Sequence, residues 1–417
     1  MAMTNDNKKS LNVPPLRFPE FKGEWRNVRA IDLLETFSTN SLTWDELNYE
    51  GGAMKDVHYG LIHQRFDSVI VDANSDLIPF INSGKEPKRY TLIEEGDLIL
   101  ADASEDIAEC GKPVEFFGKC NFPVVSGLHT IHCRDKLGIT VPGFKSFLFS
   151  SVPIKRQIAH LCEGTKIYSI SSGTLRELWL HVPDRKEQSK ITALLEKIDE
   201  RIRVQRKTIE VYKSAFSSFL SKIAQDLISS KTSLIKDLGQ PFSTGNLSWE
   251  DARKGGKTPC VLYGQLFTDY SVFIENVISS TDKTEGYISN GNEIIFPSST
   301  TVDSLSLIAP CAVLRKGILL GGDMFGIRVG SNYDPIFISA ILQTKYRKVL
   351  AAKAQGSTII HLHYDDIKNI PIETPSLAIQ QEISKAIVLT SNMAANESKI
   401  LASLETLKCF LLSNLFC

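Results

Sequence analysis

The sequence predicts an α+β protein in which two homologous globular domains are separated by a pair of long antiparallel coiled-coil helices, as a pseudo-twofold dumbbell. Three observations lead to this fold class. A set of motifs occurs twice in the same order, each copy ends in a long heptad pattern, and short apolar strands intermix with helical segments inside each copy. A chain of 417 residues is also too long for one compact core.

The clearest repeat is a ten-residue stretch. FSTNSLTWDE begins at Phe37, and FSTGNLSWED begins at Phe242, 205 positions later. The two stretches share Phe-Ser-Thr, a leucine, a hydroxyl residue, a tryptophan and two acids, which is too dense a match for chance. One part of the chain is therefore expected to be a copy of another.

Further landmarks follow in the same order in both copies. Each has a Gly turn, an apolar strand or a hydroxyl-rich loop at the matching place. The matched pairs are HYGLIHQRF with LYGQLFTDY, EEGDLILADASED with NGNEIIFPSSTTVD, VVSGLHTIHCR with LLGGDMFGIRVG, and EGTKIYSIS with QGSTIIHLH. The offset drifts from 205 to 192 as loops change length, but the order never changes, so the repeat covers whole domains.

Each copy ends in a proline and a long helical pattern, from about Lys186 to Ile228 and from about Leu377 to the C-terminus. Residues spaced alternately four and three apart form a coiled-coil seam. The seam residues are Ile191, Leu195, Ile198, Ile202, Gln205 and Ile209 in the first helix, and Ile383, Ile387, Glu397, Leu401 and Leu404 in the second.

For one such helix, packing on its own domain would be the favoured interpretation. Two matching helices in a duplicated chain favour their pairing with each other. The repeat aligns Gln205 with Glu397 near the centres of the seams, so we predict that these two residues share a polar layer.

These patterns divide the chain into an N-terminal arm (1–24), a first globular domain (25–183), a central helix (184–231), a second globular domain (232–375) and a C-terminal helix (376–417). Segments such as LILAD, TIHCR and MFGIRV predict strands. The segments FLFSSVPIKRQIAHLC and FISAILQTKYRKVLAAK predict helices.

Composition places the chain among ordinary globular proteins, with 42% hydrophobic and 23% charged residues. No apolar run approaches the roughly 20 residues that cross a bilayer, and the N-terminal MAMTNDNKKS lacks the apolar core of a secretion signal, so we expect a cytoplasmic protein and no membrane partner. The 8 cysteines form no CxxC pair and no Cys/His ligand cluster, so we expect reduced thiols and no metal.

No motif for catalysis survives inspection. The segment GGKT at Gly255 lacks the earlier glycine of a phosphate-binding loop and is followed by Pro259, and SNYDPIF lacks the second proline of an amino-methyltransferase motif. The histidine pairs His361/His363 and His129/His132 have no third ligand at a recognisable spacing. The sequence therefore predicts neither catalytic nor metal-binding residues.

The ordered set of motifs resembles the specificity subunit of type I restriction-modification systems over nearly the whole chain. The resemblance rests on LRFPEFKGEW, YGLIH, EEGDLILADASED, VVSGLHTI and EGTKIYSIS, then a heptad helix, then the second copy with FPSSTTVDS, LGGDMFGIR and QGSTIIHL. It implies a non-catalytic subunit with two target-recognition domains, each reading one half of a bipartite double-stranded DNA sequence.

The resemblance also implies partners. These are two methyltransferase (modification) subunits, docked on the helices that set the DNA spacer, and translocating endonuclease (restriction) subunits. S-adenosylmethionine, ATP and Mg²⁺ are expected only in those partner subunits, and no cofactor is expected in this chain.

Candidate DNA-binding residues are polar residues in corresponding loops of the two copies. They are Lys85, Lys88, Arg89, Lys166, Tyr168, Ser357, Thr358, His361 and His363. Gly164 and Gly356 would let backbone amides approach a phosphate, although a turn with positive φ explains a glycine equally well. Tyr59 and Tyr263, and Trp44 and Trp249, are expected in the core.

A net charge of -1 does not indicate a polyanionic partner by itself. A DNA-reading interpretation therefore requires partner subunits to supply most phosphate contacts, while this chain supplies contacts to base edges. Two alternatives stay open at this point: a nucleic-acid enzyme acting alone, and a duplicated coiled-coil scaffold that binds only proteins.

Overall fold

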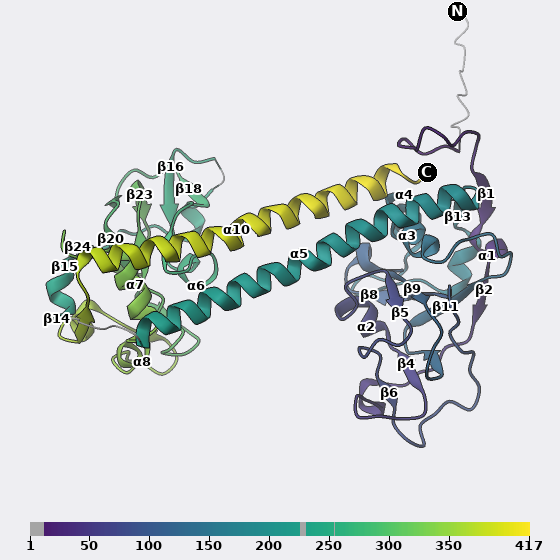
Figure 1. Ribbon diagram of the computed structural model, residues 1–417, viewed down its shortest axis with the longest axis horizontal. Coiled ribbons are helices and arrows are strands. Elements are labelled where there is room, and N and C mark those ends of the chain that lie inside the picture. The colour runs from purple at the N-terminus through teal and green to yellow at the C-terminus, as the bar shows by residue number, and fades with distance from the viewer. Residues whose placement is uncertain (1–11, 226–230, 254) are drawn as a thin grey trace, which may run out of the picture. The chain divides into compact units, whose positions relative to one another are not determined.

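The computed structural model describes residues 12–225, 231–253 and 255–417 (Figure 1). It divides into unit 1, Met1–Lys207 with Lys399–Cys417, and unit 2, Thr208–Ser398. Parts of the expected arm 1–24 and central helix 184–231 lie outside the described residues. Each unit has its own hydrophobic core.

Unit 1 is built on a five-stranded sheet of order β2-β11-β7-β9-β5. Its strands are β2 (Leu34–Phe37), β5 (Ile70–Asp72), β7 (Leu98–Ala101), β9 (Pro113–Phe117) and β11 (Thr130–Asp135). Only β5 and β9 pair in parallel. The central strand β7 is buried along its whole length, which is why its sequence LILA does not alternate with polar residues.

A second sheet of four strands has the order β10-β4-β6-β3, and two further strand pairs complete unit 1. The strands are β3 (Leu47–Asn48), β4 (Lys55–Val57), β6 (Phe80–Ile81) and β10 (Val124–Ser126), with the pairs β1 (Arg26–Arg29)–β13 (Trp179–Val182) and β8 (Ala103–Ser104)–β12 (Tyr168–Ser169).

Short helices connect and cover these sheets. They are α1 (Ala30–Leu33), η1 (Trp44–Glu46), α2 (Tyr59–Gln64), η2 (Ile107–Glu109), α3 (Phe144–Ser150), α4 (Val152–Leu161) and η3 (Ser172–Arg176). All seven residues of α3 are buried. Pro153 at the start of α4 is compatible with a first helical turn but not with a continuous helix, so the expected single helix is broken at Ser151.

Unit 2 repeats this arrangement with its own strands. In spatial order, the five-stranded sheet consists of β15 (Gly239–Ser243), β24 (Met324–Val329), β20 (Glu293–Pro297), β22 (Cys311–Val313) and β17 (Phe273–Ile274). The four-stranded sheet consists, again in spatial order, of β18 (Ser279–Thr281), β16 (Thr258–Val261), β23 (Lys316–Leu320) and β19 (Tyr287–Asn290). The strand pairs are β14 (Lys231–Leu234)–β26 (Pro371–Thr374) and β21 (Ser299–Thr300)–β25 (Ile360–His361).

The helices of unit 2 fall at the matching places. They are η4 (Ile235–Leu238), η5 (Trp249–Asp251), α6 (Gln265–Thr268), α7 (Pro335–Gln343), α8 (Arg347–Ala351) and α9 (Tyr364–Ile367). The order of the five-stranded sheet is the same in both units, and the parallel pair β4–β10 corresponds to the parallel pair β16–β23. The repeated motifs thus encode a repeated fold, which confirms the mixed α/β character of the chain.

Two long helices follow the two copies, α5 (Arg185–Gln225) and α10 (Leu377–Asn414). In unit 1, Ile191 and Leu195 of α5 share a core with Leu411 of α10. Lys408 pairs with Asp199 at 2.5 Å. Since Arg206 pairs with Glu405 at 2.8 Å, the residue numbers of the partners run in opposite directions, and the last turns of α10 are antiparallel to α5 in this unit (Figure 1).

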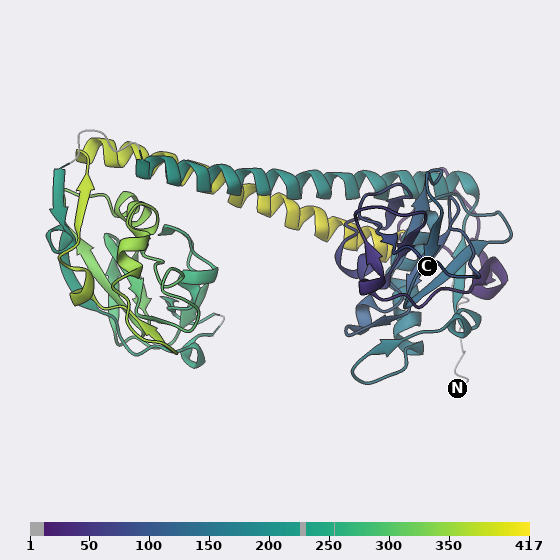
Figure 2. The same cartoon turned by 90° about the horizontal axis from the view of Figure 1, so that it is seen from below.

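In unit 2, the last turns of α5 and the first turns of α10 lie on the same side of the sheet (Figure 2). Leu220 and Ile223 belong to the same core as Ile387. Each long helix therefore contributes to the cores of both units. Gln205 belongs to unit 1 and Glu397 to unit 2, so their expected polar layer stays a prediction.

The predicted seam residues of both helices differ in burial. Buried seam positions are Ile191, Leu195, Ile202, Gln205, Ile209 and Ile387, whereas Ile198, Ile383, Glu397, Leu401 and Leu404 are half-buried.

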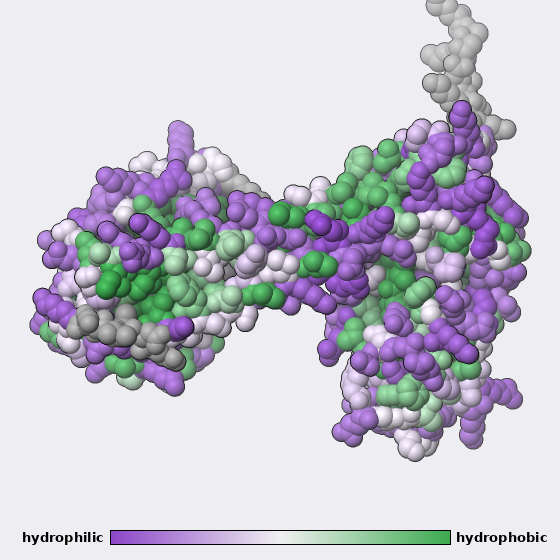
Figure 3. Space-filling view, viewed as in Figure 1, coloured by the Kyte–Doolittle hydropathy of each residue, from purple (hydrophilic) through white to green (hydrophobic). Residues whose placement is uncertain are grey.

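In the part of the chain that the structure describes, no helix is both long and apolar enough to cross a membrane. Hydrophilic residues are spread over the face of each unit drawn in Figure 3.

Candidate nucleic-acid interface

Three of the expected DNA-binding residues lie in the loop between β6 and β7. Lys85, Lys88 and Arg89 are all exposed, as is the neighbouring Tyr90. Lys85 Nζ pairs with Glu46 Oε1 at 3.1 Å, which ties this loop to η1. The loop presents positive charge to solvent on the side of the four-stranded sheet.

Lys166 and Tyr168 lie on the β8–β12 side of unit 1. Lys166 is exposed and Tyr168 is half-buried, paired with Ser104 in the register of β12 and β8. Their turn requires a glycine: Gly164 has a φ of +104°, and a Cβ there would lie 2.0 Å from the carbonyl oxygen of Ile167. Among the described residues, no hydrogen bond or ion pair joins this turn to the Lys85 loop.

The second copy has the same turn. Gly356 has a φ of +119°, and a Cβ there would lie 2.0 Å from the carbonyl oxygen of Ile359. Of the two explanations for these glycines, the steric demand of the turn is therefore sufficient. Ser357 and Thr358 are exposed in this turn.

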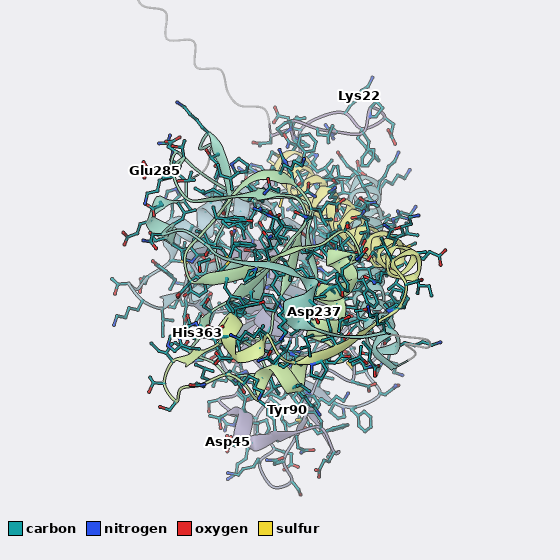
Figure 4. All side chains as sticks on the ribbon, turned by 90° about the vertical axis from the view of Figure 1, so that its left-hand side faces the viewer. Lys22, Asp45, Tyr90, Asp237, Glu285 and His363 are labelled. Atoms are coloured by element: carbon teal, nitrogen blue, oxygen red, sulfur yellow. The ribbon has the colours of Figure 1, made fainter. Side chains whose placement is uncertain are left out.

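His361 and His363 follow immediately. His361 pairs with Ser299 across β25 and β21, and His363 precedes α9, where its backbone N–H donates to Asp366 Oδ2 at 2.9 Å. Their rings are 6.2 Å apart and nearly parallel, and both side chains are exposed, with His363 on the surface of unit 2 (Figure 4). Within the described ranges, no group of three His, Cys, Asp or Glu side chains could hold a metal ion.

Unit 1 carries a groove that the sequence did not predict. It has a volume of about 530 Å³ and runs between η1, α2 and the β8–β12 pair. Trp44, Tyr59, His63 and His129 line it, with Glu105, Asp106 and Glu109 at one side. The expectation that Trp44 is a core residue is wrong, because its side chain is 42% exposed.

Unit 2 has a groove at the corresponding place. It has a volume of about 320 Å³ and is lined by Trp249, Tyr263 and Asp323, together with residues of the turn before β24. Trp249 is 58% exposed, so it too is not a core residue, whereas Tyr59 and Tyr263 are half-buried. Each indole packs closely on a glycine: a Cβ at Gly60 would lie 3.0 Å from Trp44 Cζ2, and one at Gly264 would lie 3.4 Å from Trp249 Nε1.

One residue in each groove has an unusual backbone. His129 (φ 55°) and Asp323 (φ 61°) are the only described residues other than glycine with positive φ. They stand at matching places, directly before β11 and β24. The carbonyl of His129 accepts from the backbone N–H of Asp102 at 3.0 Å, and that of Asp323 accepts from Ser298 at 2.8 Å.

The side chains of these two residues are held by neighbours. His129 Nδ1 lies 3.1 Å from Asp102 Oδ1, and Asp323 Oδ2 accepts from Ser299 Oγ at 3.0 Å. Burial raises the pKa of Asp102, while His129 opposes this shift. Burial, assisted by the nearby His129, lowers the pKa of His58 to about 4, so that ring is neutral and accepts from Gly60 N–H at 3.1 Å.

The sequence analysis did not predict these grooves, because it assigned the repeated tryptophans and tyrosines to the hydrophobic core and the glycines to turns. The signal was present in the repeated Trp of LTWDE and LSWED, together with the repeated Tyr-Gly, which recur at both grooves. Positive φ at His129 and Asp323 had only a weak sequence signal: Asp and His adopt this conformation more often than other non-glycine residues, but neither position holds a glycine.

The comparisons with known proteins agree with this geometry. Residues 229–406 match the family model of the type I restriction modification DNA specificity domain. This part of the chain therefore carries a type I specificity domain, and the resemblance stated from the sequence is confirmed. A search of curated proteins gives no match.

Solved structures extend the likeness to nearly the whole chain. An S subunit of a type I restriction-modification system from M. genitalium has 16% identity and a TM-score of 0.59, with 97% of this chain and 99% of that chain covered. A chain from a structure on complex assembly and conformational transition of the type I R-M system has 14% identity and a TM-score of 0.56, covering 93% and 96%. A HsdS subunit from Thermoanaerobacter tengcongensis has 15% identity and a TM-score of 0.46, covering 95% and 97%. At these identities, the first two structures show the fold alone, which this chain shares with the M. genitalium S subunit and with the second chain.

Proposed function

We propose that this protein is the DNA-specificity subunit of a type I restriction-modification complex. The observation that carries the proposal is that one fold occurs twice in the chain, each time with a tryptophan-lined groove, and that the second copy lies within a specificity domain. Two related DNA-recognition domains in one chain suit a DNA target that consists of two different half-sites. Each globular domain reads one of these halves.

The helices α5 and α10 hold the two globular domains apart as a dumbbell and set the length of the spacer between the half-sites. The support is the antiparallel packing of their ends within unit 1 and their shared core within unit 2. A rigid helix pair fixes separation because a helix rises about 1.5 Å per residue and resists compression. The same helices dock the methyltransferase subunits.

The complex works in the cytoplasm with two methyltransferase subunits and with endonuclease subunits that translocate DNA. S-adenosylmethionine, ATP and Mg²⁺ act in those partners, and this chain contributes recognition without catalysis. The near-neutral charge fits this division, because phosphate contacts that dominate affinity come from the partners closing around the duplex.

Within this proposal, the exposed basic residues Lys85, Lys88, Arg89 and Lys166 contact phosphates. They are exposed cations on loops, which suits backbone positioning more than base discrimination. Further polar contacts come from residues in or next to the β8–β12 and β21–β25 pairs, namely Tyr168, Ser357, Thr358, His361 and His363.

The test is to co-express the chain with its methyltransferase subunit and map modified adenines across a genome. We expect a discontinuous motif with two short specific parts and a nonspecific spacer of constant length. A continuous motif, or modification without sequence preference, would refute the proposal. Mobility shifts with and without the partner complete the test, because a scaffold that binds only proteins never shifts DNA in either sample.

A further inference from the structure

The two left-handed residues His129 and Asp323 occupy one shared position of the repeated fold, and each faces a groove with an exposed tryptophan. We propose that this position is the main base-reading position of each domain. There each side chain presents a hydrogen-bond acceptor to the exocyclic amino group of an adenine or cytosine in the major groove. The inference rests on the proposed function and assigns the residue that carries out the reading.

The backbone supports a role for the side chains. Positive φ is costly for residues with a Cβ, and glycine would adopt it without strain. Fourteen glycines of the described chain do have positive φ, so the sequence uses glycine freely where only a turn is needed. His and Asp tolerate this conformation better than most residues with a Cβ, and a polar side chain retained at the same position of two copies, where glycine would fit, indicates that the side chain itself is used.

The hydrogen bonds define what each side chain offers. A carboxylate only accepts, so the contact with Asp102 places a proton on Nδ1 of His129, and in the Nδ1–H tautomer Nε2 is an acceptor. In Asp323, Oδ2 accepts from Ser299 and Oδ1 keeps its acceptor capacity. Both residues therefore present acceptors in held orientations, which suits amino groups and not the acceptor edge of guanine.

The surroundings fit a base edge and not a phosphate. The groove of unit 1 includes Glu105, Asp106 and Glu109, whose negative charge repels the DNA backbone. The exposed faces of Trp44 and Trp249 give each groove an apolar wall against which a base or a thymine methyl packs. The titratable groups that face His129 are Asp102, His58 and the ring of Tyr59, 5.2 Å away.

The test uses the full chain co-expressed with its methyltransferase subunit, with modified adenines mapped for the wild type and for H129G and D323G. Glycine removes the side chain and relieves the strain. We expect each variant to keep its thermal stability and to lose roughly tenfold or more of its discrimination at one adenine or cytosine position, in one half-site only. The half-site read by the untouched copy serves as the internal control.

Asn variants cover the case in which a glycine variant does not fold, because Asn tolerates a left-handed backbone. We expect D323N to favour adenine, which the amide can pair at both N6 and N7. An unchanged motif in the folded variants, with stability alone reduced, would assign both residues a structural role and overturn the inference. A wild-type motif that is not bipartite would instead refute the proposed function, so the two failures are distinguishable.

Discussion

The ring of Phe416 packs edge-on against the indole of Trp25, with centroids 6.4 Å apart and ring planes at 85°. Both side chains are buried, and the ring centroid of Phe144 in α3 lies 6.0 Å from that of Phe416. The residues that follow the last helix are thereby an integral part of the core of the first domain. Three segments far apart in the sequence depend on this one ring.

We expect F416A to destabilise unit 1 by roughly 3–5 kcal/mol, the usual cost of removing a buried phenylalanine ring. The matched control is F410A in α10, because Phe410 is 53% exposed and its removal leaves no buried cavity. Calorimetric unfolding of both variants measures the difference. Equal unfolding temperatures for the two would contradict the packing described here.

The stability of unit 1 should depend on pH through Asp56. Burial raises the pKa of this carboxyl to about 7, an effect that the hydrogen bond from Asn40 at 2.6 Å only partly offsets. Since the unfolded chain ionises Asp56 near its ordinary pKa of about 4, the native state binds the proton more tightly between about pH 4 and pH 7. Stability is therefore fully present below that window and falls as the pH rises through it.

The size of this loss is roughly 4 kcal/mol if the whole shift is realised. His58, whose pKa is lowered to about 4, gains stability over part of the same pH range and opposes this loss, so the wild type must be compared with D56N. Urea unfolding at pH 5 and pH 8 should show that the wild type loses stability relative to D56N as the pH rises. The exposed Asp45 provides the control variant D45N, which should behave as the wild type does. A wild-type pH dependence that persists in D56N would show that another group is responsible.

Exchanging residues 25–183 for the corresponding domain of a related subunit should change one half of the modified motif and leave the other intact. The reason is that each copy has its own sheets and its own groove. Genome-wide mapping of modified adenines measures this directly. A change in both halves, or in neither, would show that the domains do not read separate half-sites.

Removing one heptad from each long helix, Glu200–Arg206 with Asn392–Ser398, should shorten the spacer of the motif. The deletion keeps the seam in phase and removes about 10 Å of helix, which corresponds to about three base pairs of B-form DNA. The rotation of about 100° around the duplex must be absorbed by bending or loose docking, so loss of binding is the other outcome that agrees with the ruler role. An active, folded variant with an unchanged spacer would mean that the partner subunits set the distance.

Much of the architecture could be predicted from local patterns. The repeat of Phe37 and Phe242 indicated two copies of one fold, and the four-three spacing from Ile191 onward indicated a long helix, because periodicity is a property of consecutive residues. The glycine turns at Gly164 and Gly356 were recognisable for the same reason. These features need no knowledge of what lies across the fold.

Tertiary structure decided the rest. Trp44 and Trp249 pack on glycines that lie at the starts of separate helices, and the core of the first domain includes Phe416 from the far end of the chain. His129 and Asp323 adopt a left-handed backbone because hydrogen bonds to a neighbouring strand end hold it there. The sequence by itself determined the repeat and the helices, whereas burial and strain depend on contacts between distant segments, which no local pattern encodes.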